Sequence, residues 1–244
     1  MQNAGYGEFA EAYDALTFNV PYDELAEYYR RILRSLSDGK KLLDLGCGTG
    51  NLTVRLADMG FQVIGQDASE EMLTLASGKS DKVRWMRRDM TKTRLTSPAD
   101  MIISTLDSIN HLKSAEDISE CFKRAFENLK PGGAFVFDVN TVYKHREVLG
   151  NNTFVYDLGY VYCVWQNEFC PGDNGVDIEL DMFFEKGKTY TRGYESFREI
   201  ALSEEEYRRR LEQAGFEVVN VWEYPTFSKP TERSEKLLIS AKKR

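Results

Sequence analysis

The sequence predicts an α/β fold in which a doubly wound, mostly parallel sheet carries an inserted antiparallel β segment. Three observations lead to this prediction. Short apolar runs alternate with helix-patterned segments from residue 41 to residue 138, period-two alternation follows up to residue 200, and helical period returns at Ser203. Alternation of strands and helices is typical of parallel sheets with right-handed crossovers. A chain of 244 residues suits one domain with a subdomain inserted into it.

The first segment, residues 1–38, is expected to form an N-terminal helical cap. A helix is predicted from about Tyr22 to Leu36, because apolar residues recur there at helical spacing and Ser37-Asp38-Gly39 closes the pattern. This segment either covers a ligand or is an ordinary packing helix behind an irregular start.

The core is expected to consist of residues 39–140 and 201–244. Its first five strands are predicted near residues 41–45, 62–67, 83–88, 99–104 and 133–138. The helix between the fourth and fifth strands begins at the capping residue Ser114 and ends before Pro131. Two further strands, which follow a last helix, suit a terminal antiparallel hairpin.

Residues 141–200 are expected to form an antiparallel β insertion. Acidic and aliphatic residues alternate over Asp177–Met182, so the acids share one face of a strand and the aliphatic residues the other. Residues 161–169 are predicted to form a neighbouring strand, and turn-forming residues occupy 170–175.

The composition excludes several classes of protein. The 32 basic and 39 acidic residues give a net charge of −7, and the insertion carries six basic and ten acidic residues, which is a poor surface for a phosphate backbone. No apolar run is long enough for a membrane helix, so we expect neither nucleic acid nor membrane as a partner. The four cysteines show no paired spacing and there are two histidines, so we expect no metal site and a cytoplasmic location.

A glycine-rich loop is the most informative local feature. The apolar run that begins at Leu42 ends in Asp44, and Gly46, Gly48 and Gly50 follow at two-residue spacing before a helical pattern starts. A strand, a glycine loop and a helix start together favour a nucleotide cofactor, because the backbone and its free N–H groups can approach an anionic ligand. The bland alternative is a tight strand-to-helix turn.

Acidic residues recur at the predicted carboxyl ends of the first four strands. These are Asp44, Asp67, Asp89 and Asp107. The carboxyl edge is where open α/β sheets bind their ligands. Asp67 lies 21 residues after Gly46, a position from which an acid can accept hydrogen bonds from both ribose hydroxyls.

The string Asp44–Gly50 resembles motif I of the class I S-adenosylmethionine-dependent methyltransferases, and the whole chain resembles small-molecule members with a β insertion over the active site. The resemblance covers residues 40–140 and, more weakly, 200–241. It implies a seven-stranded Rossmann-like sheet, S-adenosyl-L-methionine as cofactor, and in-line methyl transfer to a small-molecule acceptor. The oligomeric state is not predicted.

Position and resemblance together suggest the cofactor-binding residues. Met72 and Met90 are expected beside the adenine, Leu106 beside the methionine portion, and Cys47 as a small apolar filler of the loop. The full set is Tyr22, Asp44, Gly46, Cys47, Gly48, Gly50, Asp67, Ala68, Met72, Asp89, Met90, Leu106 and Asp107.

The catalytic candidates are His111 and Tyr13. His111 is the only histidine at the predicted active edge, and an imidazole is a common general base, although a surface histidine is the alternative. Tyr13 could offer an aromatic face to a sulfonium. The substrate-binding candidates are Asn110, Trp165, Arg192 and Glu195. Arg192 either anchors a carboxylate of the acceptor or pairs with an acid of the insertion.

Three other functions compete with a small-molecule methyltransferase. An NAD(P)-dependent oxidoreductase is disfavoured because Asn51 occupies the third glycine position of Gly-x-Gly-x-x-Gly. A nucleic-acid methyltransferase is disfavoured because Asp107-Ser-Ile-Asn110 replaces the Asn/Asp-Pro-Pro-Tyr expected for adenine methylation. A non-catalytic sensor of the cofactor stays open, because Phe197 stands where similar proteins are expected to carry a histidine.

Overall fold

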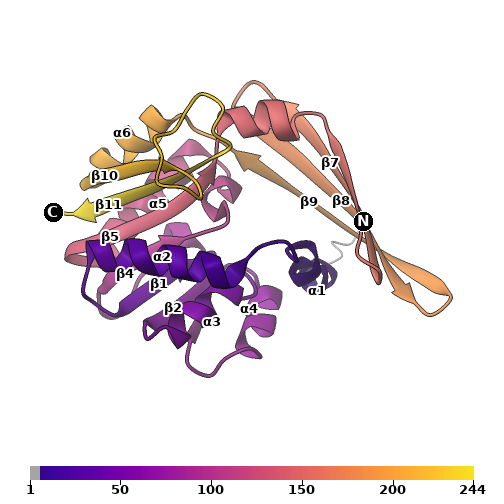
Figure 1. The fold of residues 1–244 in the computed structure, drawn as a ribbon, viewed down its shortest axis with the longest axis horizontal. Coiled ribbons are helices and arrows are strands. Elements are labelled where there is room, and N and C mark those ends of the chain that lie inside the picture. The colour runs from indigo at the N-terminus through magenta and orange to yellow at the C-terminus, as the bar shows by residue number, and fades with distance from the viewer. Residues whose placement is uncertain (1–5) are drawn as a thin grey trace.

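The computed structural model describes residues 6–244 and contains two sheets (Figure 1). The main sheet has seven strands, in the spatial order β10 (Phe216–Glu223), β11 (Lys236–Lys243), β5 (Leu129–Asn140), β4 (Ala99–Ser104), β1 (Lys41–Leu45), β2 (Gln62–Asp67) and β3 (Arg84–Arg87). The five strands from β5 to β3 are parallel, and β11 runs antiparallel to both of its neighbours. The predicted fold class, including the terminal hairpin, is therefore confirmed.

Helices cover both faces of the main sheet because adjacent residues of a strand point to opposite sides. Leu42 belongs to the core that contains α2 (Tyr22–Leu36) and α3 (Asn51–Asp58). Leu43 belongs to the opposite core, with α5 (Ala115–Asn128) and α6 (Glu204–Ala214). The remaining elements of this part are α4 (Glu70–Ser77) and the 3₁₀ turns η1 (Met90–Lys92) and η2 (Ser108–His111).

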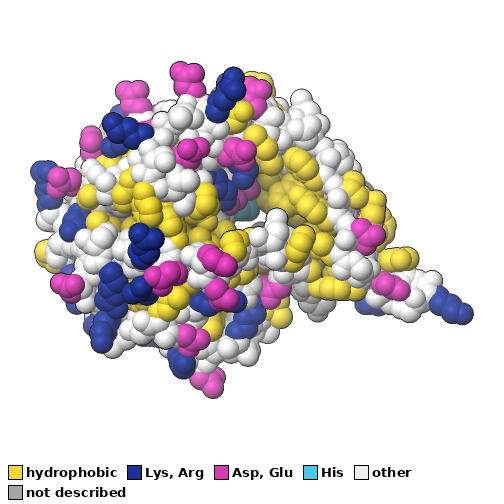
Figure 2. Space-filling model, in the orientation of Figure 1, with side chains coloured by type: hydrophobic (Ala, Val, Ile, Leu, Met, Phe, Trp, Pro, Cys, Tyr) yellow, Lys and Arg dark blue, Asp and Glu magenta, His cyan; other side chains and the backbone are white. Residues whose placement is uncertain are grey.

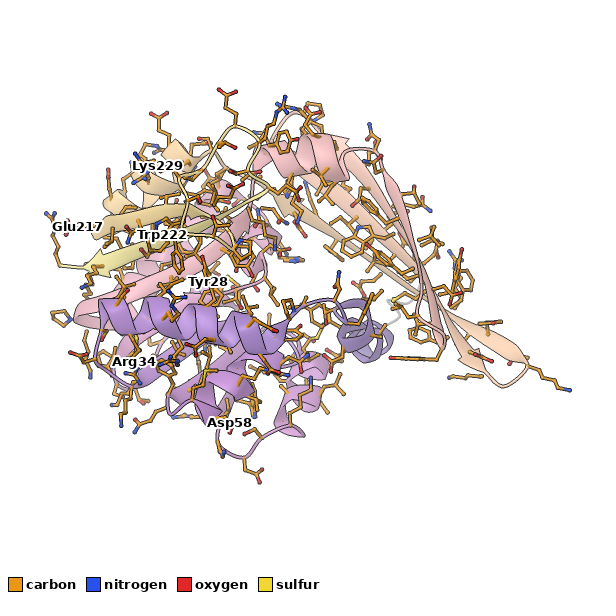
Figure 3. The ribbon with its side chains drawn as sticks, in the orientation of Figure 1. Tyr28, Arg34, Asp58, Glu217, Trp222 and Lys229 are labelled. Atoms are coloured by element: carbon orange, nitrogen blue, oxygen red, sulfur yellow. The ribbon has the colours of Figure 1, made fainter. Side chains whose placement is uncertain are left out.

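The loop between β10 and β11 folds back onto α2. The Tyr28 hydroxyl donates a hydrogen bond to the Thr226 carbonyl, and Phe227 packs against the rings of Tyr28 and Trp222 at centroid distances of 5.1 and 5.4 Å. Figure 3 shows Tyr28 and Trp222 on this side of the sheet, well away from the second sheet.

The second sheet is antiparallel, in the order β6 (Thr153–Asp157), β7 (Val161–Cys170), β8 (Gly175–Lys186) and β9 (Thr189–Ile200). A short π-helical segment, η3 (Lys144–Leu149), leads into it from β5. Its inner face packs on Ala12 and Leu16 of α1 (Tyr6–Leu16), and Figure 1 shows α1 between the two sheets. The side chains of residues 1–9 and 11 lie outside this description. We propose three units: the cap 1–38, the insertion 141–200, and one core formed jointly by 39–140 and 201–244.

A hollow lies between the main sheet and the second sheet. Figure 2 shows its wall of hydrophobic side chains on the side of the second sheet, and basic and histidine side chains at its floor. Among the described residues, no helix is long and apolar enough to cross a membrane.

Candidate active site

The glycine loop has a left-handed backbone at each of its three glycines. Gly46, Gly48 and Gly50 have φ values of 72°, 54° and 78°. A Cβ at Gly46 would lie 2.7 Å from the Ser108 hydroxyl, so this position is closed by the protein itself. Among the described atoms, the nearest to a Cβ at Gly48 would belong to Tyr13, at 4.0 Å. The open side of Gly48 therefore leaves the backbone accessible to a ligand.

Asp67 ties the glycine loop to the start of α4. One carboxylate oxygen accepts the N–H of Gly48 at 2.8 Å and the other accepts the N–H of Ser69 at 2.9 Å. Ser69 in turn caps α4 by accepting the N–H of Met72, which is buried. Because each carboxylate oxygen has two lone pairs, Asp67 can still accept hydrogen bonds from a diol. Ala68 lies directly beyond it at the same edge.

Asp89 caps η1, since one of its oxygens accepts both the backbone N–H and the hydroxyl of Thr91, at 2.8 and 2.7 Å. Met90 is half-buried, and its terminal methyl lies 3.3 Å from the Cβ position of Gly46. The structure thus brings both residues to the carboxyl edge, beside the glycine loop.

A narrow pocket adjoins the loop and contains an unpaired buried oxygen. Among its lining residues are Tyr13, Tyr22, Asp44, Cys47 and Leu106. Asp44 is buried, and one of its oxygens accepts the Thr53 hydroxyl at 2.6 Å while the other has no partner among the residues that the structure describes. Burial raises the pKa of Asp44 to about 7. An open glycine and an orphaned carboxylate oxygen fit a ligand with a cationic or hydrogen-bond-donating group, as the expected cofactor has.

Two pocket residues take uncharged forms. Burial raises the pKa of the Cys47 thiol and of the Tyr13 phenol far above their ordinary values. Cys47 is thus an uncharged thiol beside the loop. Tyr13 and Tyr22 can supply neutral aromatic faces to a cation.

A strained turn separates this pocket from a second one. Leu106 and Asp107 have φ values of 54° and 57°, which non-glycine residues rarely adopt. The buried Asp138 carboxylate holds the turn, because its oxygens accept the N–H groups of Leu106 and Asp107 at 2.8 and 2.9 Å. It also accepts the Tyr29 hydroxyl at 2.6 Å. The fifth strand thereby fixes the loop that follows the fourth.

The second pocket, of about 230 Å³, lies between the sheets. Its apolar wall comes from the inner face of the second sheet, and its polar floor from the carboxyl edge of the main sheet and the end of β9. The lining residues are Asp107, Asn140, Lys144, Leu149, Phe154, Tyr156, Trp165 and Glu199. Asp107 lines this pocket and its neighbours Leu106 and Ser108 line the first, so the two pockets are adjacent.

The floor of the second pocket is a connected polar network. The Asn140 amide donates to Asp107 at 3.2 Å and to Glu199 at 2.8 Å, and its oxygen accepts the Lys144 ammonium at 3.0 Å. Lys236 forms an ion pair with Asp107, and this ammonium holds the pKa of Asp107 well below its usual range. Burial lowers the pKa of Lys144.

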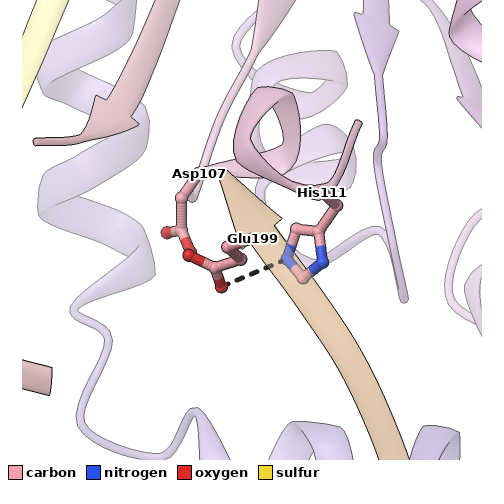
Figure 4. A group of neighbouring side chains, drawn as sticks. All are labelled: Asp107, His111 and Glu199. Atoms are coloured by element: carbon pink, nitrogen blue, oxygen red, sulfur yellow. Dashed lines mark ion pairs between the residues drawn. The ribbon is translucent and has the colours of Figure 1, made fainter. Parts of the chain in front are cut away.

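Figure 4 shows Asp107, His111 and Glu199 converging at this floor. His111 Nε2 lies 3.7 Å from a Glu199 oxygen, and the His111 ring packs on Phe197 at 5.0 Å. One ligand atom from each of the three residues would fit within 4.8 Å. Because Lys236 and Asn140 already bind the Asp107 carboxylate, we assign no metal to this group.

The structure contradicts two of the predicted substrate contacts. Asn110 is fully buried, and its amide bonds the backbone of Asn140 and Ile200, so it joins three elements and does not face the pocket. Arg192 lies on the outer face of β9 and pairs with Asp181 of β8. Side chains alternate between the two faces of a strand, and Glu195 and Glu199 point toward Asp107 and the hollow. Arg192, an odd number of residues away from both, therefore points to the outer face.

The three remaining residues predicted on the acceptor side lie in or beside the second pocket. Trp165 lines the second pocket. Glu195 is half-buried on the inner face of β9, where burial raises its pKa, but it does not line the pocket. His111 is 44% exposed and stands behind Glu199, beside the pocket and not in its lining.

Sequence reasoning missed the network residues Glu199, Asn140, Lys144, Asp138 and Lys236. Two signals could have found some of them. Asn140 and Asp138 end the fifth strand, where the rule used for the first four strands applies equally. Glu199 follows Glu195 by two strand periods, so it shares the inner face. Lys236 and Lys144 carry no local signal.

Comparisons with known proteins identify the family. A model described as a methyltransferase domain matches residues 42–133. YqeM of Bacillus subtilis (strain 168), named as a methyltransferase, is 34% identical over 98% of this chain and 97% of its own length. The cypemycin N-terminal methyltransferase of a Streptomyces species is 27% identical, over 83% and 82% of the two chains.

A solved S-adenosylmethionine-dependent methyltransferase from Clostridium acetobutylicum ATCC 824 superposes with a TM-score of 0.87 and 30% identity, and the match covers 98% of each chain. The glycine loop, the acids at the strand ends and the seven-stranded sheet agree with this likeness. The chain therefore belongs to the class I S-adenosylmethionine-dependent methyltransferases and uses S-adenosyl-L-methionine as its cofactor.

Proposed function

We propose that this enzyme methylates a nitrogen atom of a small-molecule amine that binds in the second pocket. The observation that carries the proposal is the composition of this pocket, which combines an aromatic wall with two carboxylates directly beside the cofactor-binding edge. The wall consists of Phe154, Tyr156 and Trp165. Aromatic faces and carboxylates both attract a protonated amine, by about 0.5–2 kcal/mol for each well-placed ring.

The cofactor side follows from the first pocket. We assign the ribose to Asp67, and the cationic methionine portion to the unpaired oxygen of Asp44 and the rings of Tyr13 and Tyr22. When bound, S-adenosyl-L-methionine supplies a methyl group activated by a sulfonium. The protein aligns the acceptor with it and excludes water.

The size and charge of the second pocket limit the acceptor. At about 230 Å³ it falls below the roughly 300–1,000 Å³ of most ligand pockets, which favours a small group over a polymer. One curated relative is named for methylation of an N terminus, which also supports a nitrogen acceptor. The net charge of −7 argues against a nucleic acid. All four cysteines are free, which suits the cytoplasm.

Transfer of a labelled methyl group tests the proposal. The purified protein is incubated with labelled S-adenosyl-L-methionine and a panel that comprises an amino sugar, a dipeptide with a free amino terminus, benzylamine, a phenol and a DNA duplex. We expect label on at least one of the three amines and none on the phenol or the duplex. Label confined to the phenol or the duplex would refute the nitrogen assignment. If no compound of the panel is labelled although the protein still binds the cofactor, the result would favour a non-catalytic sensor of the cofactor.

Trp165→Ala distinguishes acceptor binding from cofactor binding, because Trp165 lines only the second pocket. We expect a KM for the best amine raised about tenfold, in line with the loss of an aromatic contact of about 1–2 kcal/mol. The affinity for the cofactor should not change. Tyr162→Ala on the outer face of the same strand is the matched control.

A further inference from the structure

We propose that Glu199 is the catalytic residue that takes the proton of the acceptor nitrogen, with His145 as its buried positioning residue and His111 as the route to solvent. This rests on the proposed amine acceptor. Glu199 ends the inner face of β9, is 3% exposed and lines the acceptor pocket, so a bound amine can reach its carboxylate.

His145 fixes the protonation of this pair. Its ring is fully buried, and Nδ1 lies 2.9 Å from the carbonyl oxygen of Asn174. A carbonyl oxygen only accepts, so Nδ1 must carry a proton. Nε2 lies 3.3 Å from Glu199 Oε2. Two lone pairs would face each other there unless a second proton lies between them.

Asn140 indicates that this second proton belongs to His145. The Asn140 amide donates to the same atom, Glu199 Oε2, at 2.8 Å. Oε2 is therefore already an acceptor, as a carboxylate oxygen with two donors would be. An imidazolium of His145 beside an ionised Glu199 satisfies every polar atom of this contact.

The charges around the pair balance when His145 and Glu199 share one extra proton, and the Asn140 contact assigns this proton to His145. The connected network holds three carboxylates, from Asp107, Asp138 and Glu199, against two ammonium groups, from Lys144 and Lys236. A cationic His145 brings the two sides to three charges each. Uncompensated charge in a buried cluster is costly, which favours the balanced state.

The second oxygen of Glu199 can then exchange a proton. Its Oε2 is held by Asn140 and His145, whereas Oε1 faces His111 Nε2 at 3.7 Å, with Asp107 and Lys144 as the other charged groups of the pocket. His111 is 44% exposed and can release a proton to water. Figure 4 shows Glu199 between Asp107 and His111.

The proton balance of the step is as follows. The amine binds in its protonated form and first gives one proton to Glu199 Oε1, which frees the lone pair of the nitrogen. This lone pair forms the new bond to the methyl carbon while the carbon–sulfur bond breaks and sulfur keeps its electron pair, and the product leaves as the methylated ammonium. Glu199 passes the proton that it took to His111 Nε2, and His111 passes it to water, so the carboxylate is regenerated.

Nitrogen NMR of the two histidines tests the pair without any acceptor. The chain contains only His111 and His145, so a His111→Asn variant assigns both rings in protein labelled with ¹⁵N-histidine. At pH 7.5 we expect both nitrogens of His145 to be protonated in the wild type. In Glu199→Gln we expect Nε2 to move to the position of an unprotonated ring nitrogen, because the Gln amide can donate to it. Glu179→Gln, on the outer face of the same sheet, should leave the spectrum unchanged.

A neutral His145 in the wild type, or an imidazolium that survives in Glu199→Gln, would overturn the pairing. Catalysis is tested separately with whichever amine of the panel is methylated fastest. Glu199→Gln should lower kcat about 100-fold, the lower range of general acid–base effects, with unchanged calorimetric affinity for the cofactor. A kcat within about threefold of the wild type would overturn the catalytic role.

The positioning role of His145 has its own readout. His145→Gln keeps a donor toward Glu199 and should lose less activity than His145→Ala, and both variants should shift the pH–rate profile. A loss that tracks stability alone, with an unchanged profile, would reduce His145 to a packing residue. A panel without any methylated amine would refute the proposed function, while the NMR result would still decide the proton pair.

Discussion

The two pockets of this enzyme are built in different ways. The cofactor pocket is shaped by backbone: left-handed glycines, N–H groups held by Asp67, and a strained turn held by Asp138. The acceptor pocket is shaped by side chains that meet from separate elements, such as Trp165, Lys144 and Glu199. A backbone site requires particular residues at fixed local spacing, whereas a side-chain site depends on the register of distant strands. The cofactor pocket can therefore be predicted from a short stretch of sequence, whereas the acceptor pocket cannot.

The largest effect is expected at Asp138, which joins the two pockets. Asp138→Asn removes one acceptor from a buried group that binds Tyr29 and the N–H groups of Leu106 and Asp107, and it leaves Lys236 with one carboxylate fewer. We expect a loss of about 3 kcal/mol in the free energy of unfolding, measured by urea titration. The exposed Asp58→Asn, at the end of α3 (Figure 3), should cost nothing measurable. Equal stability of the two variants would show that the turn at Leu106 and Asp107 does not depend on the hydrogen bonds to Asp138.

The fold was predictable from local patterns, because its core alternates strands and helices at regular spacing. The predicted strands at 41–45, 62–67 and 99–104 agree with β1, β2 and β4. The fifth strand is longer than predicted, beginning at Leu129, because Pro131-Gly132-Gly133 interrupts its pairing without ending the strand. The irregular pairing of a strand is set by its neighbour, and the sequence of one strand does not reveal it.

The candidate site was predictable to the extent that it lies on the backbone. The glycine loop and Asp67 occur where their spacing places them. The sequence left two roles open for Arg192, and the structure shows the pair with an acid of the insertion. A shift of one residue along β9 reverses the face of a side chain, so the choice between the two roles required the register of the sheet. Asn110 was misjudged because a polar residue after a strand serves a buried hydrogen-bond network as readily as a ligand.

The second largest effect is expected on the cofactor side. If Asp67 binds both ribose hydroxyls, each hydrogen bond to the carboxylate contributes about 1.5–3 kcal/mol, so Asp67→Ala should weaken cofactor binding at least ~100-fold. Isothermal titration calorimetry measures this, with Asp58→Ala as the control and circular dichroism as the check on folding. An unchanged dissociation constant would show that the ribose does not bind Asp67.

A smaller, pH-dependent effect is expected from Asp44. Burial raises its pKa from 3.8 to about 7, so the folded protein holds a proton that the unfolded chain has released between these values. The stability that this protonated group contributes is therefore fully present below pH 3.8, decreases as the pH rises, and is lost once the pH exceeds about 7. Above pH 7, the ionised Asp44 presents its unpaired oxygen to the cationic cofactor.

Cofactor affinity should therefore increase about tenfold between pH 6 and pH 8, the change expected for a group that must ionise with a pKa near 7. Asp44→Asn removes the titrating group and should flatten this dependence. The same variant should stabilise the free protein at pH 8 relative to the wild type, because it no longer buries a charge. If cofactor affinity depends on pH in the same way in the wild type and in Asp44→Asn, the cofactor does not contact Asp44.

The smallest effect is expected at Arg192, and it is the sharpest test of the register. Arg192 pairs with Asp181 on the outer face, where 61% of its side chain is exposed, so the ion pair contributes little to stability. Arg192→Ala should leave KM, kcat and cofactor affinity as in the wild type. Glu195 lies on the inner face of β9, the same face as Glu199. We therefore expect Glu195→Ala to change turnover more than Arg192→Ala does. A raised KM in Arg192→Ala alone would mean that the acceptor extends around the edge of β9. In that case the acceptor pocket would include the outer face of β9, the edge strand, which the comparison of the two regions assigns to solvent.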